Sequence, residues 1–188
     1  LAPGEHRARL VIASNDPANL RLFVPITLTV DARNPVTLFF DPAHSDVALN
    51  STFRVDVMLN SEKQPIDSVD TIITFDPRIV QVVDIYGKPA SQVTAGVDLP
   101  LVLQNSVNNA SGRIAYGAGR RLGDKPPAGL FRLATIRFRA ISQTAAAAGM
   151  PLVFTPASQV YFGGENILGH SEEGAIIVQA PWFTGKVT

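Results

Sequence analysis

The stretch that decides the fold is residues 66–85, IDSVDTIITFDPRIVQVVDI. Residues 68–75 alternate with a period of two, which is the spacing of a β-strand with one buried face. The inner face would carry Val69, Thr71, Ile73 and Phe75, and the outer face Ser68, Asp70, Ile72 and Thr74. Asp76-Pro77 then ends this strand because proline has no N–H for a ladder. A second apolar strand, residues 80–85, follows directly.

The same alternation continues on both sides of this stretch. Its clearest example is Thr52–Leu59, and no run of a dozen residues has helical spacing. Further strands are predicted at residues 7–13, 20–30, 36–40, 101–105, 113–118, 130–141, 152–155, 160–162 and 175–179. Clusters of Gly, Pro, Asn and Asp separate them, so the sequence predicts an all-β sandwich or barrel. Helix is limited to at most one turn, with residues 124–131 as the best candidate.

Composition describes an ordinary globular protein. The 188 residues are 46% apolar and 17% charged, and sixteen Lys plus Arg balance sixteen Asp plus Glu. This balance leaves no net field that would attract nucleic acid. No apolar run approaches the roughly 20 residues that cross a bilayer, so no membrane insertion is expected. The absence of Cys excludes disulfides and thiolate metal sites.

The sequence divides into three parts. Residues 1–33 predict a β-hairpin with a turn at residues 14–19, followed by a linker without apolar anchors. Because an isolated hairpin is marginal in water, we expect it to be the end of a preceding module. Residues 34–180 form the main domain and residues 181–188 a tail. Any export signal is expected outside this sequence.

Residues that could carry chemistry are sparse. His6, His44 and His170 are far apart and lack metal-ligand spacing, so no metal site is predicted. No serine stands in a nucleophile-elbow pattern. Glu172-Glu173 are adjacent on an extended segment and would point to opposite sides. The sequence therefore predicts a protein that is not an enzyme and that needs no cofactor.

Two resemblances add to this interpretation. The segments PGE (3–5), LVIASNDP (10–17) and VPITLTV (24–30) resemble the last two strands of bacterial immunoglobulin-like surface modules. Residues 36–179 resemble a cohesin module, the receptor half of the cohesin–dockerin pair. The resemblance rests on the order and spacing of VTLFF (36–40), FRVDV (53–57), IDSVDTIITFDP (66–77), IVQVVDI (79–85), GRIAY (112–116), FRLATIRF (131–138) and GAIIV (174–178). It implies a nine-stranded jelly-roll β-sandwich with the N-terminal hairpin in front of it.

The cohesin resemblance also implies a site. Alternation places Tyr116 inward and leaves a row of small residues on the outer side of the strand that begins at Arg113. In cohesins this strand and residues 68–74 form the dockerin-binding face. The implied partner-binding residues are Ser68, Asp70, Ile72, Thr74, Ala115, Gly117, Gly119 and Arg121. Arg120-Arg121 stands where the family often has an acidic residue, which favours a partner with acidic groups.

The function implied is that of a non-catalytic interaction module that binds a dockerin-type domain through one flat sheet face. Such modules tether enzymes or surface proteins in extracellular assemblies that break down polysaccharides, and calcium would belong to the partner's EF-hand-like loops. The expected location is extracellular or the cell surface. Two alternatives stay open, a carbohydrate-binding module and a structural spacer. The sequence does not predict the row of exposed aromatic residues that carbohydrate-binding modules usually present to sugars.

Overall fold

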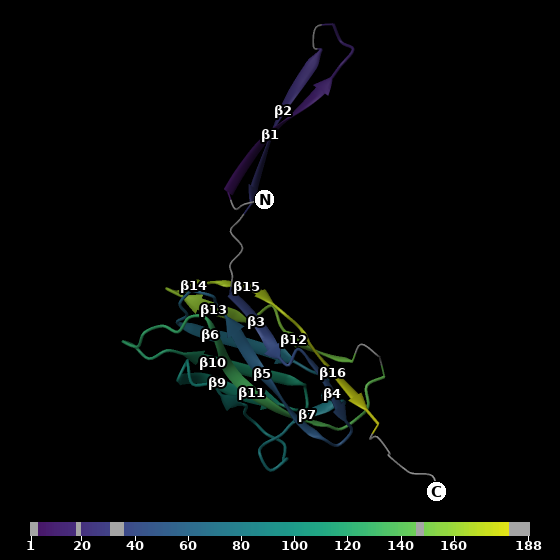
Figure 1. Cartoon of the computed structure of the whole chain (residues 1–188), viewed down its shortest axis with the longest axis vertical. Coiled ribbons are helices and arrows are strands. Elements are labelled where there is room, and N and C mark those ends of the chain that lie inside the picture. The colour runs from purple at the N-terminus through teal and green to yellow at the C-terminus, as the bar shows by residue number, and fades with distance from the viewer. Residues whose placement is uncertain (1–3, 18–19, 31–35, 146–148, 181–188) are drawn as a thin grey trace. The chain divides into compact units, whose positions relative to one another are not determined.

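The computed structural model describes residues 4–17, 20–30, 36–145 and 149–180, and the predicted linker and tail lie largely outside them. The described residues contain strands and no helix, and therefore no helix that could cross a membrane (Figure 1). The chain divides into two units, Leu1–Asn34 and Pro35–Thr188. Each unit is described by itself.

The first unit is a hairpin of β1 (Gly4–Ala13) and β2 (Arg21–Val30). The strands are antiparallel, and Leu10 lies opposite Val24. Since directly opposite residues share a face, one face carries Ala8, Leu10, Ile12, Leu22, Val24, Ile26 and Leu28. The other face carries charged and polar residues together with Val11, Phe23 and Pro25, and its Arg9 guanidinium lies 4.6 Å from the ring centre of Phe23. Most side chains of the apolar face are exposed.

The second unit contains two sheets. The larger has eight strands, in the order β14-β13-β6-β12-β16-β4, and β10 and β9 continue it from β6. Its strands are β4 (His44–Ala48), β6 (Ser68–Thr74), β9 (Leu101–Asn108), β10 (Arg113–Gly119), β12 (Met150–Phe154), β13 (Gln159–Phe162), β14 (Glu165–Asn166) and β16 (Gly174–Gln179). One edge of β6 pairs with β10, and its other edge pairs with β12 and β13.

The smaller sheet has six strands, in the order β15-β3-β5-β11-β7, and β8 also pairs with β11. Its strands are β3 (Val36–Asp41), β5 (Thr52–Asn60), β7 (Val80–Val82), β8 (Thr94–Ala95), β11 (Leu130–Ala140) and β15 (Leu168–Ser171). Neighbouring strands are antiparallel except for β15 with β3 in this sheet and β16 with β4 in the larger one.

The core fills the space between the two sheets. Phe40 of β3 stacks on Phe154 of β12 with ring centres 4.3 Å apart, which joins the smaller sheet to the larger one. Phe75, just after β6, meets Phe138 of β11 edge to face at 5.5 Å. Aromatic contacts of this kind contribute beyond the apolar area that they bury. Together with buried Val, Leu and Ile side chains of both sheets they form one apolar cluster.

Alternation assigned the inner faces of the central strands correctly. Val55, Val57 and Leu59 of β5 are buried, as are Val69, Thr71 and Ile73 of β6. Thr71 is tolerated in the core because its hydroxyl donates to the Tyr116 carbonyl at 3.0 Å. Tyr116 points inward as predicted and is 2% exposed. The helical turn suggested for residues 124–131 is wrong, because Pro126 and Pro127 lie in an irregular segment that leads into β11.

Candidate functional site

The predicted partner-binding residues of β6 and β10 lie on one face of the eight-stranded sheet, on the side away from the core. The register places Ser68 opposite Gly119, Asp70 opposite Gly117 and Ile72 opposite Ala115. Thr74 lies opposite Arg113, which extends the same rows. Two segments separated by about forty residues of sequence are thereby joined into one surface, called here the outer face.

The small residues of β10 are not the open strip that the sequence suggested. Ala115 is only 1% exposed, and Gly117 and Gly119 are buried although they belong to the outer face. A Cβ atom added at Gly117 would lie 2.4 Å from Asp70 Oδ1, so the Asp70 side chain extends over this glycine. Longer neighbours therefore cover the small residues. A partner would meet the neighbours and not the backbone of β10.

Asp70 is the acidic residue of β6 on this face. It is exposed, and it forms no ion pair within the described residues. On the other edge of β6, away from Gly117, Asp70 lies opposite Gln159 of β13 in the register of the sheet. Ser68 lies opposite Tyr161. The Tyr161 hydroxyl donates to the Gln159 side-chain oxygen. These two β13 side chains extend the outer face beyond β6 and were not among the predicted site residues.

Ile72 lies where the pairing of β6 changes from β13 to β12. Its N–H donates to Ser158 Oγ at 3.0 Å, and its carbonyl accepts the Thr155 N–H at 2.8 Å. The loop between β12 and β13 therefore supplies the hydrogen bonds that a strand would otherwise make. This arrangement fixes β6 at the centre of the face.

Strand β9 completes the outer face along its free edge. Ser106 pairs with Ala115, Gln104 with Gly117 and Asn108 with Arg113, which adds three polar side chains to the rows. A register shift after Gly117 brings Leu103 toward Gly119, where its Cδ1 would be 3.8 Å from an added Cβ. Leu103 is 62% exposed. The sequence indicated a strand here but gave no face, because Leu101-Val102-Leu103 does not alternate.

One end of the outer face is held by an ion pair that the sequence did not reveal. Arg120 Nε donates to Asp67 Oδ1 at 2.6 Å, and the Gly163 N–H donates to Asp67 Oδ2 at 2.8 Å. Both bonds hold the pKa of Asp67 below its usual range, and the Arg120 bond contributes most. Arg120, one of the two arginines that were expected to favour an acidic partner, is therefore already paired within the chain.

Arg121 differs from its neighbour. It lies two residues beyond the end of β10, is exposed, and makes no ion pair among the described residues. Leu122, the next residue, is fully exposed. The structure thus places Arg121 at the end of the outer face, in the loop that the Asp67–Arg120 pair supports, and not within the sheet.

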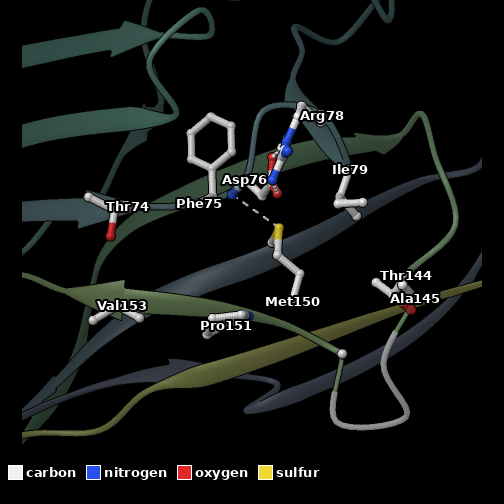
Figure 2. A pocket seen from close by; sticks show the side chains of 11 residues that line it. Thr74, Phe75, Asp76, Arg78, Ile79, Thr144, Ala145, Met150, Pro151 and Val153 are labelled. Carbon is white, nitrogen blue, oxygen red and sulfur yellow. Dashed lines mark hydrogen bonds and ion pairs between the residues drawn. The ribbon is translucent and has the colours of Figure 1, made fainter.

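A hollow of about 650 Å³ lies at the other end of β6 (Figure 2). Its lining is mainly apolar and includes Phe75, Ile79, Met150 and Val153, together with Thr74 of the predicted site. The dashed line in Figure 2 marks the Asp76 N–H donating to Met150 Sδ at 3.2 Å.

The charged groups of this hollow are Asp76 and Arg78, and they bind each other. Two side-chain hydrogen bonds, of 3.0 and 2.7 Å, join them. The pairing lowers the pKa of Asp76 and raises that of Arg78. The lining holds no third titratable group among the described residues. The hollow can accept an apolar side chain, but its residues do not form an acid–base pair.

Metal binding has no candidate in the part of the chain that the structure describes. There, no three His, Asp or Glu side chains gather as a ligand set. His44 lies on β4 and His170 on β15, in different sheets. The chemistry that the outer face can perform is hydrogen bonding and apolar contact with a macromolecular surface.

Comparison with solved structures identifies the fold. The chain is similar to the solution structure of the cohesin CaCohA2 from Clostridium acetobutylicum, with 21% identity and a TM-score of 0.60 over 78% of this chain and 92% of that one. It is also similar to a type II cohesin domain from the cellulosome of Acetivibrio cellulolyticus, with 11% identity and a TM-score of 0.60 over 75% and 93%.

A third similar structure is the cohesin of a type I cohesin–dockerin complex from Clostridium thermocellum, with 12% identity and a TM-score of 0.60 over 77% of this chain and 92% of that one. No family model and no curated protein matches the sequence. The all-β class and the cohesin jelly-roll fold predicted from the sequence are confirmed. The immunoglobulin-like origin of the hairpin remains a prediction.

Proposed function

We propose that this chain is a non-catalytic protein-binding module whose outer face binds a dockerin-type domain. The observation that carries the proposal is the joining of Asp70 and the polar side chains of β6, β9 and β13 into one surface over a cohesin fold. Solved neighbours in complex with dockerins support the choice of partner.

The chemistry of the face favours a helical partner. A flat sheet with a polar centre and an apolar edge at Leu103 matches a helix that presents polar groups along one side and an apolar side chain at one end. Asp70 would accept hydrogen bonds from the partner, and Arg121 would pair with a partner's acidic group. The buried small residues keep the centre flat without forming contacts of their own.

The proposal also covers the metal that the partner would carry and the place where the module would act. A dockerin-type partner would bring calcium in its own EF-hand-like loops, and the module itself would need no cofactor. Its place would be the cell surface or the extracellular space, within an assembly that acts on polysaccharides. The cellulosomal origin of a solved neighbour supports this setting.

Calorimetric titration of the full chain with each dockerin of the same source tests the proposal. Saturable binding in calcium and its loss in a chelator are expected, because the partner's loops fold only with the metal. An affinity that persists unchanged in the chelator would contradict the proposal. The absence of binding to every dockerin would also contradict it and would favour the spacer.

Two variants locate the site. Asp70→Ala removes the exposed carboxylate, and Gly117→Ala forces that carboxylate to move, since the new Cβ would lie 2.4 Å from Oδ1. Each is expected to weaken binding at least about tenfold. The matched control is Asp46→Ala on β4, an exposed acid three strands away from β6 in this sheet. Equal affinities for all four proteins would remove the site assignment.

We also propose that the hairpin of β1 and β2 ends a preceding immunoglobulin-like sandwich. Its support is the row of exposed apolar side chains along one face, including Leu10, Ile12 and Leu22. A hairpin with such a face needs a second layer to bury it. In this arrangement residues 31–33 act as a linker between two modules.

A further inference from the structure

The outer side of the smaller sheet carries a row of arginines that the pairing register brings together. Arg54 of β5 lies directly opposite Arg137 of β11, and Arg139 follows on the same side of β11. Like charges placed opposite each other across two strands are destabilising. None of the three forms an ion pair within the described residues. This set, Arg54, Arg137 and Arg139, is called here the arginine face.

None of the nearby acids forms an ion pair with the arginine face. Asp56 accepts a hydrogen bond of 2.5 Å from Thr135 Oγ1 and pairs with Arg132 at 3.6 Å, which directs its charge toward the other end of β11. Asp41, on the neighbouring strand β3, lies directly opposite Asp56 in the register of the sheet. Asp84 uses Oδ1 to accept the N–H groups of Tyr86 and Lys88. Arg54, Arg137 and Arg139 therefore have no ion-pair partner among the described residues, and together with Arg132 they outnumber the three acids by one.

A small hollow borders these arginines. It holds about 170 Å³. Its lining combines Arg137, Thr135, Thr94 and Gln92 with the Asp84 carboxylate and with apolar residues that include Val83, Ile85 and Val93. Thr94, Gln92 and Arg137 can each donate hydrogen bonds to oxygen atoms of a ligand, whereas the Thr135 hydroxyl already donates to Asp56. At about 30 Å³ per water, the hollow has the space of roughly five or six waters. One ring of a polar chain fits a space of this size that is lined by both hydrogen-bond donors and apolar side chains.

An exposed aromatic ring stands beside the hollow. Tyr86 is 80% exposed in the loop that Asp84 holds closed through its two backbone hydrogen bonds. Arg139 extends to this loop, since a Cβ added at Gly87 would lie 2.7 Å from its Nη2. The Arg139 guanidinium therefore reaches the loop that carries Tyr86, and this loop follows Ile85, which lines the hollow together with Arg137.

We propose that the arginine face, its hollow and Tyr86 bind an acidic polysaccharide, one whose sugar rings carry carboxylates. Arginine binds carboxylates with two parallel hydrogen bonds. The Thr and Gln side chains would bind sugar hydroxyls, and Tyr86 would stack on a ring. This site is on the sheet opposite the outer face, so the inference does not depend on the dockerin-type partner.

A glycan fits these observations better than nucleic acid. Single-stranded nucleic acid is bound by a long basic groove with several aromatic stacking partners. Here three arginines are flanked by Asp41 and Asp56, and one tyrosine accompanies them. The positive charge covers a short segment only, which suits an anion on successive sugar rings.

The test is calorimetric titration of the full chain with a short oligogalacturonate, at about 0.15 M salt so that nonspecific attraction is screened. A chelator is present throughout, so calcium cannot bridge the carboxylates. Saturable binding is expected, and the same oligosaccharide with every carboxyl methyl-esterified is expected not to bind. Equal binding of the ester, tighter binding of a single-stranded oligonucleotide, or no binding at all would overturn the proposal.

Variants assign the site. Arg137→Gln with Arg139→Gln is expected to weaken binding at least about tenfold, and Tyr86→Ala by about two- to tenfold. The matched control, Lys63→Gln with Lys125→Gln, removes the same charge from exposed loop positions at the opposite end of β5 and β11. It should change affinity by less than about twofold. An equal loss in the control would show attraction by net charge only.

One further variant separates binding from folding. Arg54→Glu places an acid opposite Arg137, so it replaces a repulsive pair by an attractive one. We expect a higher urea midpoint for unfolding and at least about fivefold weaker oligogalacturonate binding. A variant that gains stability and retains full affinity would contradict the role of the arginine face.

Discussion

The single carboxylate of Asp67 holds one end of the outer face in place. It accepts hydrogen bonds from Arg120 and from the Gly163 N–H, and so it joins the end of β10 to the turn between β13 and β14. Its pKa is lowered in the folded protein, mainly by Arg120. The chain separates these partners by 53 and 96 residues, so no local pattern in the sequence could indicate the cluster.

Asp67→Asn should therefore destabilise the fold in a pH-dependent way. A group whose folded pKa is depressed stabilises above its unfolded pKa, about 3.9, and loses that contribution as pH falls through the folded value. The side chain is 27% exposed, so we expect a loss of about 1 kcal/mol near pH 7. Urea unfolding at several pH values measures it.

The stability difference between the original chain and Asp67→Asn should shrink as the pH drops below about 4. Asp46→Asn, a change at an exposed acid on β4, serves as the control and should cost little at every pH. A stability gap for Asp67→Asn that stays constant down to pH 2 would show that the carboxylate acts through packing and not through its charge.

At the level of elements, alternation predicted faces where a strand lies between two neighbours and is buried on one side. It succeeded for β5, β6 and β10. It gave no face for β9, where Leu101, Val102 and Leu103 are all exposed on an edge strand and the register shifts after Gly117. Edge position and bulges depend on the partner strand, which a single strand's sequence does not contain.

The burial of Ala115, Gly117 and Gly119 was missed for a related reason. Alternation assigns a side of the sheet, but exposure on that side depends on the length of neighbours such as Asp70 and Leu103. Arg137 and Arg139 stand in the sequence as plainly as the small residues of β10 do. Their significance depends on the register with Arg54, and therefore on the structure.

The turn between β9 and β10 offers a prediction about an element. Gly112 has a φ of 64° and is buried, and a Cβ there would lie 2.0 Å from the Phe75 carbonyl oxygen. Gly112→Ala is expected to lower the free energy of unfolding by at least about 2 kcal/mol, through backbone strain and displacement of β6. Gly123→Ala is the control, since its φ is 92° but nothing lies within 4 Å.

Urea denaturation of the two glycine variants measures the difference. Gly123→Ala retains only the conformational penalty, about 1 kcal/mol. Equal losses in both variants would mean that backbone conformation alone decides the cost, and that the close approach of Gly112 to Phe75 has no energetic weight.

At the scale of the whole molecule, the chain consists of a sandwich and of a hairpin whose apolar face is exposed. The core cluster consists of residues from Val36 onward, so the sandwich does not draw on the hairpin for its core. A chain of residues 35–188 is therefore expected to unfold at the same urea midpoint as the full chain. Its free energy of unfolding should differ from that of the full chain by less than about 0.5 kcal/mol. A large loss would show that residues 1–34 belong to the same cooperative unit.

Charge is also organised at this scale. Sixteen basic and sixteen acidic residues cancel in the sum, but the register concentrates Arg54, Arg137 and Arg139 on one sheet and leaves Asp70 exposed on the other. The two sides of the sandwich thus differ in the ligands they favour. Net charge indicates bulk attraction only and does not describe either side.

The central claim is that a dockerin-type partner covers the outer face of the eight-stranded sheet. Hydrogen–deuterium exchange of the full chain, with and without its calcium-loaded partner, tests it directly. We predict slower exchange in β6, β9 and β10 upon binding, with β5 and β11 unchanged. Protection confined to β5 and β11, or a complex that protects neither sheet, would contradict the account.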